Sequence, residues 1–319
     1  MEQLAALDPD SLYVRTYLYG GLGNQLFQCA AGRSLAARVG ARLVLDVSSY
    51  RRPDEYRRFC LDGFAIDADV MDDDSPPLPN FDRPGKSIFM PLRLWIAKHG
   101  GWRTASRISA NRRDRTRFPL FQERSFDYDA RFATLTAPIS LVGYWQSARY
   151  FASIAAIIRS EFRLKAEPAG ENARWLEMMG HPHAVCLHFR RGDYLQTSHM
   201  RSHGLCSMAY YTRAMAHIRE CIGNPQFFVF SDDWAGARER FKDDDTVHVD
   251  TNGPDAAGEE LRLMSACRHH IVANSSLSWW AAWLGGQAGQ MVIAPDPWFT
   301  RPWPAPDLLP ESWSVLARE

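Results

Sequence analysis

Two adjacent arginines follow an apolar run in the second half of this chain, within residues 188–194, whose sequence is HFRRGDY. The run at 184–187 predicts a buried strand, so Arg190 and Arg191 come where that strand ends. Ligands bind at the carboxyl ends of strands in open α/β sheets, and a planar guanidinium group suits phosphate oxygens better than any other side chain. We therefore expect a diphosphate-bearing ligand at the end of this strand.

The other apolar runs of this half alternate with helical patterns, which indicates a parallel, doubly wound sheet. Strands are expected at 227–230, 247–250, 270–273 and 290–294. Two of them are followed by consecutive polar residues, namely Ser231-Asp232-Asp233 and Asn274-Ser275-Ser276. Because parallel strands have their carboxyl ends at one edge of the sheet, both clusters should converge with the two arginines on one crevice.

A glycine-rich turn follows the first predicted strand, at 14–19. It continues into a helix as Gly20-Gly21-Leu22-Gly23-Asn24-Gln25, the helix ends at Gly40, and a second strand covers 41–46. Glycines at such a βαβ turn let a ligand approach the backbone, although close packing of strand on helix explains them equally well. Asn24 and Gln25 are harder to explain by packing, because a helix needs only one capping residue.

The length of 319 residues is enough for two domains, since single cores rarely grow beyond about 250–300 residues. A strand at 139–145 and a helix at 150–162 precede the segment 167–170, EPAG, which has the composition of a linker. We predict an N-terminal domain at 1–167 and a C-terminal domain at 168–319, both of the α/β class.

The net charge and the charged runs of the sequence indicate which kinds of partner the protein can bind. The net charge of +0 argues against a nucleic-acid partner, which usually requires a basic surface. The basic run 112–117 is interpreted as a solvated face, with contact to an acidic substrate or a membrane surface as the second interpretation. The aspartates at 72–74 precede prolines and are interpreted as a solvated loop rather than a metal site. The oligomeric state cannot be predicted from these patterns.

Three features bear on the compartment. The uncharged stretch 271–295 is interrupted by polar residues and glycines, so we interpret it as strand, helix and strand rather than a membrane span. Residues 1–10 are acidic and lack the basic start of a signal peptide. The six cysteines have no C-x-x-C spacing, and several fall in apolar patterns typical of buried thiols. We expect a cytoplasmic protein, with any membrane contact at the inner surface.

Four segments spread over most of the chain resemble the α-1,2-fucosyltransferase family (glycosyltransferase family 11) and, more distantly, the α-1,6- and protein O-fucosyltransferases. They are GLGNQLFQ at 21–28, HFRRGDY at 188–194, FSDD at 230–233 and NSSLSWWAAWL at 274–284. The resemblance implies a GT-B-like fold, with two Rossmann-type domains facing a central cleft. It also implies GDP-β-L-fucose as the donor substrate, inversion of the anomeric centre, and no cofactor or divalent metal.

The resemblance also implies roles for the two arginines and two aspartates. Arg190 would clamp the diphosphate and stabilise charge on the departing GDP, with Arg191 sharing that task or anchoring the motif. Asp232 or Asp233 would accept hydrogen bonds from the guanine base, while capping of the next helix is the alternative for one of them.

The resemblance also implies roles for other positions. His188 would contact GDP or be a core histidine, and Asp193 would be the general base or orient an arginine. Asn24 and Gly23 would face the donor or the acceptor from the other domain. Three polar residues at a helix N-terminus would bind the donor, namely Asn274, Ser275 and Ser276. Three tryptophans on an apolar helix are expected in the core, namely Trp279, Trp280 and Trp283.

These expectations describe an enzyme that transfers L-fucose to a hydroxyl of a galactose-containing oligosaccharide or polysaccharide, forming an α-1,2 linkage. The alternatives are another linkage or another GDP-sugar, because the recognised segments mostly handle the donor. A nucleotide- or glycan-binding protein without turnover is disfavoured, since the arginine pair and the C-terminal domain are both intact.

Overall fold

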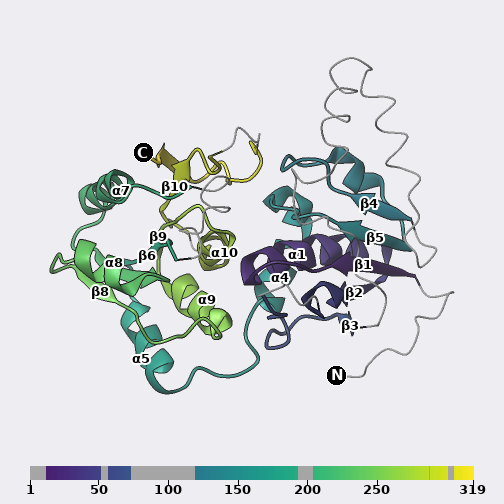
Figure 1. The fold of residues 1–319 in the computed structure, drawn as a ribbon, viewed down its shortest axis with the longest axis horizontal. Helices are drawn as coiled ribbons and strands as arrows, with labels where there is room; N and C mark the ends of the chain where they lie inside the picture. Colours follow the sequence, from purple (N-terminus) through teal and green to yellow (C-terminus); the bar gives the residue numbers. More distant parts are fainter. Residues whose placement is uncertain (1–11, 52–56, 73–118, 193–203, 287, 301–304) are drawn as a thin grey trace, which may run out of the picture. The chain divides into compact units, whose positions relative to one another are not determined.

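The computed structural model describes residues 12–51, 57–72, 119–192, 204–286, 288–300 and 305–319. The chain divides into two compact units (Figure 1). The first comprises Met1–Leu61 and Ile66–Ile158, and the second comprises Asp62–Ala65 and Arg159–Glu319. Each unit is built on one parallel sheet, which confirms the expected pair of Rossmann-type α/β folds. The cleft between them stays a prediction.

The first unit contains a five-stranded sheet in the order β3-β2-β1-β5-β4. Its strands are β1 Tyr13–Tyr17, β2 Arg42–Asp46, β3 Asp69–Met71, β4 Leu120–Gln122 and β5 Ile139–Val142. The helix α1, Leu22–Val39, connects β1 to β2 as predicted, and it ends at Gly40, whose φ of 66° is left-handed.

Short helices complete the first unit around the ends of its strands. They are η1 Ser48–Arg51, η2 Ala130–Thr134, η3 Ala148–Tyr150, η4 Ala152–Ile154 and the first residues of α4 Ala155–Glu161, a helix that continues past Ile158 into the second unit. The single helix predicted at 150–162 is therefore wrong in its first part. Phe151 has φ −133° and ψ 15°, which is not helical, so the chain forms two 3₁₀ turns before α4 begins.

The second unit contains a six-stranded sheet in the order β11-β10-β9-β6-β7-β8, and all its described pairings are parallel. The strands are β6 Ala184–Phe189, β7 Gln226–Ser231, β8 Thr246–His248, β9 His269–Ile271, β10 Val292–Asp296 and β11 Ser314–Ala317. The helices are α5 Gly170–Met179, α7 Met208–Cys221, α8 Trp234–Arg240, α9 Ala257–Ala266 and α10 Ser276–Gly285. This alternation confirms the doubly wound sheet expected for the second half.

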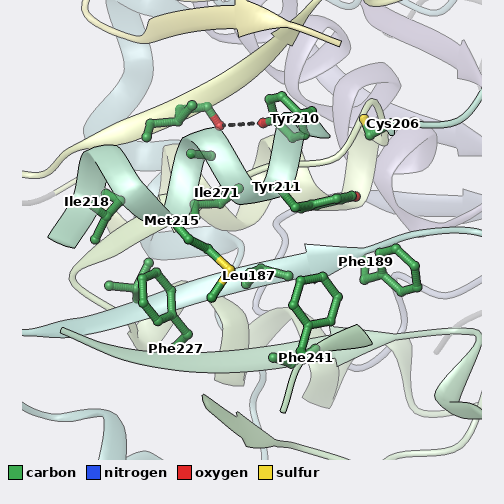
Figure 2. Close-up of a cluster of buried hydrophobic side chains, with 14 of the residues drawn as sticks. Leu187, Phe189, Cys206, Tyr210, Tyr211, Met215, Ile218, Phe227, Phe241 and Ile271 are labelled. Carbon is green, nitrogen blue, oxygen red and sulfur yellow. Dashed lines mark hydrogen bonds between the residues drawn. The ribbon is translucent and has the colours of Figure 1, made fainter. Parts of the chain in front are cut away.

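One hydrophobic core cluster of the second unit lies between α7 and the sheet (Figure 2). Leu187 and Phe227 from neighbouring strands meet Met215 and Ile218 of α7, and all four are buried. The Tyr210 hydroxyl lies 2.7 Å from the carbonyl oxygen of Val272, so its polar end is satisfied within this apolar layer. The core fixes β6 and β7, the two strands that carry the predicted arginines and aspartates.

Other expectations can be checked against these units. Trp279, Trp280 and Trp283 of α10 are buried, as predicted. The six cysteines, all within the described residues, are free thiols. None of the helices in the described part of the chain combines the length and apolar character needed to cross a membrane. Residues 1–10, the aspartates at 73–74 and the basic run 112–117 lie outside the described residues.

One buried ion pair joins β1 to β2 in the first unit. Arg15 is 2% exposed, and its Nε lies 2.8 Å from Oδ2 of Asp46, whose other carboxylate oxygen accepts the Ser48 N–H at 2.9 Å. The guanidinium also lies 4.6 Å from the centroid of the Tyr17 ring. Both charges are thus compensated, and removal of one partner would leave the other buried and unpaired.

We expect Arg15→Met to lower the free energy of unfolding by about 3–5 kcal/mol, because Asp46 then keeps an uncompensated buried charge. Arg238→Met is the matched control. Its ion pair with Asp250 is exposed, and its loss should cost less than about 1 kcal/mol. The double variant Arg15→Met/Asp46→Leu should recover most of the loss. Urea denaturation measures all three, and equal effects for the Arg15 and Arg238 variants would contradict this account.

Candidate functional site

The ends of β6 and β7 bring the predicted arginines and aspartates together. The two strands pair in parallel with Phe189 opposite Ser231, so the residues that follow them emerge side by side. Ser231 closes the pair, because its hydroxyl donates to the Phe189 carbonyl at 2.8 Å and accepts the Asp233 N–H at 2.9 Å. The register of this pairing therefore decides which arginine meets which aspartate.

Asp232 contacts both arginines. Its Oδ2 lies 3.0 Å from Nε of Arg190, and its Oδ1 accepts the backbone N–H of Arg191 at 2.8 Å. Gly192 packs against the same carboxylate, since a Cβ added there would lie 2.8 Å from Oδ2. The glycine of the HFRRGDY segment is thus required by this close approach to Asp232.

Asp233 and Arg191 have local structural roles. Asp233 is the N-cap of α8, and its Oδ1 accepts the Gly236 N–H at 2.9 Å. Nε of Arg191 lies 3.6 Å from Oδ2 of Asp233, and its guanidinium lies 5.6 Å from the centroid of the Phe189 ring. Helix capping, one of the two interpretations weighed for these aspartates, therefore holds for Asp233. The guanine contact stays a prediction.

Glu260 of α9 is a further acidic group at this site, and the sequence analysis missed it. Burial raises its pKa to about 7, while the positive charge of Arg190 lowers it and the negative charge of Asp232 raises it. Arg190 is therefore influenced by two carboxyl groups. In the sequence, Glu260 looks like an ordinary acidic residue in the first turn of a helix, so no local signal could have identified it.

The third polar cluster follows β9, which pairs with β6 on the side away from β7. Asn274 is buried, and its amide donates to the carbonyl oxygens of Gly204 and Trp298, both at 3.2 Å. It thereby joins two loops at the sheet edge. The three clusters thus follow three neighbouring parallel strands, as predicted.

The remaining candidates of the second unit have these positions. Ser275 is the N-cap residue of α10 without a side-chain capping bond, and Ser276 is the first residue of that helix. His188 is buried in β6, and its carbonyl oxygen accepts the Tyr211 hydroxyl at 3.0 Å. Asp193, the candidate base, lies outside the described residues. The donor-binding roles of these residues stay predictions.

In the first unit, Gln25 explains part of the glycine-rich segment. Its buried amide donates to the carbonyl oxygens of Gly20 at 3.0 Å and Arg58 at 2.8 Å, and it accepts the Cys60 N–H at 2.9 Å. It therefore ties residues 58–60 to the glycine turn.

Asn24 and Gly23 lie in the first turn of α1, which has Gly21 as its N-cap residue. The side-chain oxygen of Asn24 accepts a hydrogen bond from Nε2 of Gln146 at 2.9 Å. This bond connects the glycine-rich segment to the loop that follows β5. The predicted contacts of Asn24 and Gly23 to the donor or acceptor stay predictions.

Within the described ranges, no group of three or more His, Cys, Asp or Glu side chains is placed to hold a metal ion. A decision on metal dependence therefore needs an assay. The electrostatic elements described at the edge of the second sheet are two guanidinium groups and three acidic side chains, Asp232, Asp233 and Glu260.

Comparison with known proteins identifies similar sequences. The family model described as Glycosyl transferase family 11 matches residues 127–305. An α-1,2-colitosyltransferase of Escherichia coli is 31% identical, with 89% of this chain and 91% of that protein covered. The O-antigen biosynthesis glycosyltransferase WbnK of Escherichia coli is 30% identical, with 88% and 93% covered. The galactoside α-(1,2)-fucosyltransferase 1 of Bos taurus is 30% identical, with 49% and 46% covered.

The raised pKa of Glu260 predicts a pH dependence of stability. The unfolded chain releases this proton near pH 4.5, whereas the native state holds it until about pH 7. The native state therefore binds more protons between these values, and the contribution of Glu260 to stability falls as pH rises through that window.

We expect the unfolding free energy of wild type minus that of Glu260→Gln to decrease from pH 4.5 to about pH 7 and to level off above it. Denaturant titrations at a series of pH values measure this difference. Glu259→Gln, in the same helical turn, controls for the loss of one acidic side chain at this position. If the difference in unfolding free energy does not change between pH 4.5 and about pH 7, the buried position of Glu260 is contradicted.

Proposed function

The chain belongs to glycosyl transferase family 11, and from this membership we propose that it transfers L-fucose from GDP-β-L-fucose to a hydroxyl of a galactoside, with inversion and an α-1,2 linkage. The observation that carries the proposal is the match to an α-1,2-colitosyltransferase over 89% of this chain. The similar protein of Bos taurus is named as a galactoside α-(1,2)-fucosyltransferase. The 1,2 linkage is common to both names.

The transferred sugar differs between the two names, and this defines a second candidate. The colitosyltransferase covers most of this chain, whereas the bovine fucosyltransferase covers 49% of it. A colitosyl donor is therefore the alternative to the fucosyl donor within the same proposal. The acceptor is proposed to be a galactose-containing oligosaccharide or polysaccharide.

The described site offers a chemical basis for leaving-group departure. When a sugar leaves a nucleoside diphosphate, negative charge develops on the diphosphate oxygens, and a fixed guanidinium stabilises that charge. Arg190 suits this role, since Asp232 holds its side chain at 3.0 Å and the side chain is 19% exposed. Because a diphosphate is a good leaving group, a weak base suffices for the attacking hydroxyl, and Asp193 is our candidate.

The first test is transfer itself. We expect the purified protein to transfer fucose from GDP-fucose to lactose or N-acetyllactosamine in the presence of EDTA, and we expect linkage analysis to show an α-1,2 product. A parallel reaction with GDP-colitose distinguishes the two donors. Transfer to other acceptors only would contradict the galactoside assignment, and a product of another linkage would contradict the α-1,2 assignment. Either result would leave the family assignment intact.

The second test concerns Arg190. We expect Arg190→Ala to lower kcat by about 10²–10³, the usual cost of removing an electrostatic group that acts in the transition state. Arg190→Lys should lower kcat by a smaller factor, since lysine keeps the positive charge but lacks the planar guanidinium group. Arg219→Ala, which removes two ion pairs between α7 and the loop before β8, with Asp243 and Asp245, is the control for loss of an arginine. Wild-type turnover in Arg190→Ala would contradict the clamp assignment.

A further inference from the structure

The loop 143–147, which follows β5, contains a strained residue. Trp145 is fully buried and has φ 56°, a left-handed conformation that is rare for a bulky side chain. Asn224 also has positive φ, but asparagine adopts this region readily. Strain of this kind persists only where the surroundings enforce it. The contacts that enforce the left-handed conformation of Trp145 therefore show which neighbouring side chains the loop holds in a fixed position.

A buried carboxyl group holds the backbone of the loop. Glu123, directly after β4, accepts the N–H of Tyr144 at 2.6 Å and the N–H of Trp145 at 3.0 Å. Burial raises the pKa of this carboxyl group to about 8, although the two backbone bonds lower it. Gly143 allows the close approach, since a Cβ added there would lie 2.8 Å from Oε2 of Glu123. The turn is thus fixed by groups that are costly to bury.

The indole of Trp145 anchors the same turn in the aromatic core. Its ring centroid lies 5.9 Å from that of Phe121, 5.7 Å from that of Phe132 and 5.3 Å from that of Tyr150. Ser147 closes the loop, as its N–H donates to the Trp145 carbonyl at 2.8 Å. With its backbone and its central side chain both fixed, the loop presents Tyr144 and Gln146 in a defined geometry.

Both presented side chains lie beside the glycine-rich segment. Nε2 of Gln146 donates to Oδ1 of Asn24 at 2.9 Å. The Tyr144 ring lies edge-on to Tyr19 at 5.0 Å and is stacked with Phe126 at 6.0 Å. Because β5 pairs in parallel with β1, the loop after β5 and the turn after β1 belong to the same edge of the sheet. Two amides and an aromatic ring therefore share that edge.

The chemistry of this group matches a neutral sugar. Among the described residues, neither Oε1 of Gln146 nor Nδ2 of Asn24 makes another hydrogen bond. One atom accepts and the other donates, as the hydroxyls of a pyranose require, and the aromatic ring suits its C–H face. None of the three side chains is charged, so a diphosphate would find no counter-ion among them.

We propose that Gln146, Asn24 and Tyr144 form the subsite that binds the ring of the acceptor sugar. The inference rests on the proposed function and deepens it, because it names residues that recognise the acceptor. The same hydroxyl chemistry could come from the hexose of the donor, so the test must separate the two substrates.

The experiment compares Gln146→Leu with wild type in steady-state transfer. We expect the KM for the galactoside to rise about tenfold, since a hydrogen-bonding group is replaced by an apolar one, while the KM for the GDP-sugar changes less than about twofold. Gln226→Leu, at the amino end of β7, is the control for loss of a glutamine. Tyr144→Phe should keep the wild-type KM for the acceptor, and Tyr144→Leu should raise it.

The outcomes separate this inference from the proposed function. A rise in the KM for the GDP-sugar alone would overturn the assignment to the acceptor, and unchanged KM values for both substrates would overturn the subsite. If wild type transfers no sugar at all, the proposed function fails. In that case saturation-transfer NMR with lactose decides the subsite, since binding to wild type that is lost in Gln146→Leu supports it, and equal signals overturn it.

A folding defect in a variant could also raise the KM for the acceptor, so the stability of each variant is measured as well. Thermal unfolding of each variant shows whether the unit is intact, and Gln146→Asn provides a second variant that keeps the amide at a shorter reach. We expect it to unfold at the wild-type temperature and still to raise the KM for the acceptor. A Gln146→Asn variant with the wild-type KM for the acceptor would contradict the placement of the Gln146 amide in the subsite.

Discussion

The register of β6 against β7 is the constraint on which the candidate site of the second unit depends. With Phe189 opposite Ser231, the next residue along each strand is Arg190 and Asp232 respectively. A slip of one residue would turn each side chain to the other face of the sheet and separate the ion pair. The apolar layer beneath, with Leu187 and Phe227 against α7, makes such a slip costly because it would expose buried surface (Figure 2).

Both units place candidate binding residues at the carboxyl edge of a parallel sheet, but they hold these residues in place by different means. In the second unit, charges hold one another in place, as Asp232 engages both Arg190 and the backbone of Arg191. In the first, the buried carboxyl group of Glu123 holds a strained backbone turn, and the side chains of Gln146, Asn24 and Tyr144 are uncharged. The proposed function assigns the diphosphate of the donor to the charged group and the acceptor sugar to the uncharged one.

Local patterns explain what could be predicted. The apolar run of β6 and the polar residues after it are contiguous, so both the strand and the arginines at its end could be predicted. Short edge strands such as β3 and β11 carry no comparable signal. Glu260 could not be found, because its electrostatic interaction with Arg190 arises only in the tertiary structure, 70 residues along the chain. The same holds for Gln25, whose partners at 58–60 are set by tertiary structure.

The contact between Gly192 and Asp232 couples two positions that are far apart in the chain. Any side chain at 192 would displace the carboxylate that holds Arg190, whereas a smaller residue at 232 would make room for one. Substitutions at these two sites are therefore not independent. Directed evolution toward a new donor should vary the two positions jointly, because libraries that diversify either one alone will mostly sample broken ion pairs.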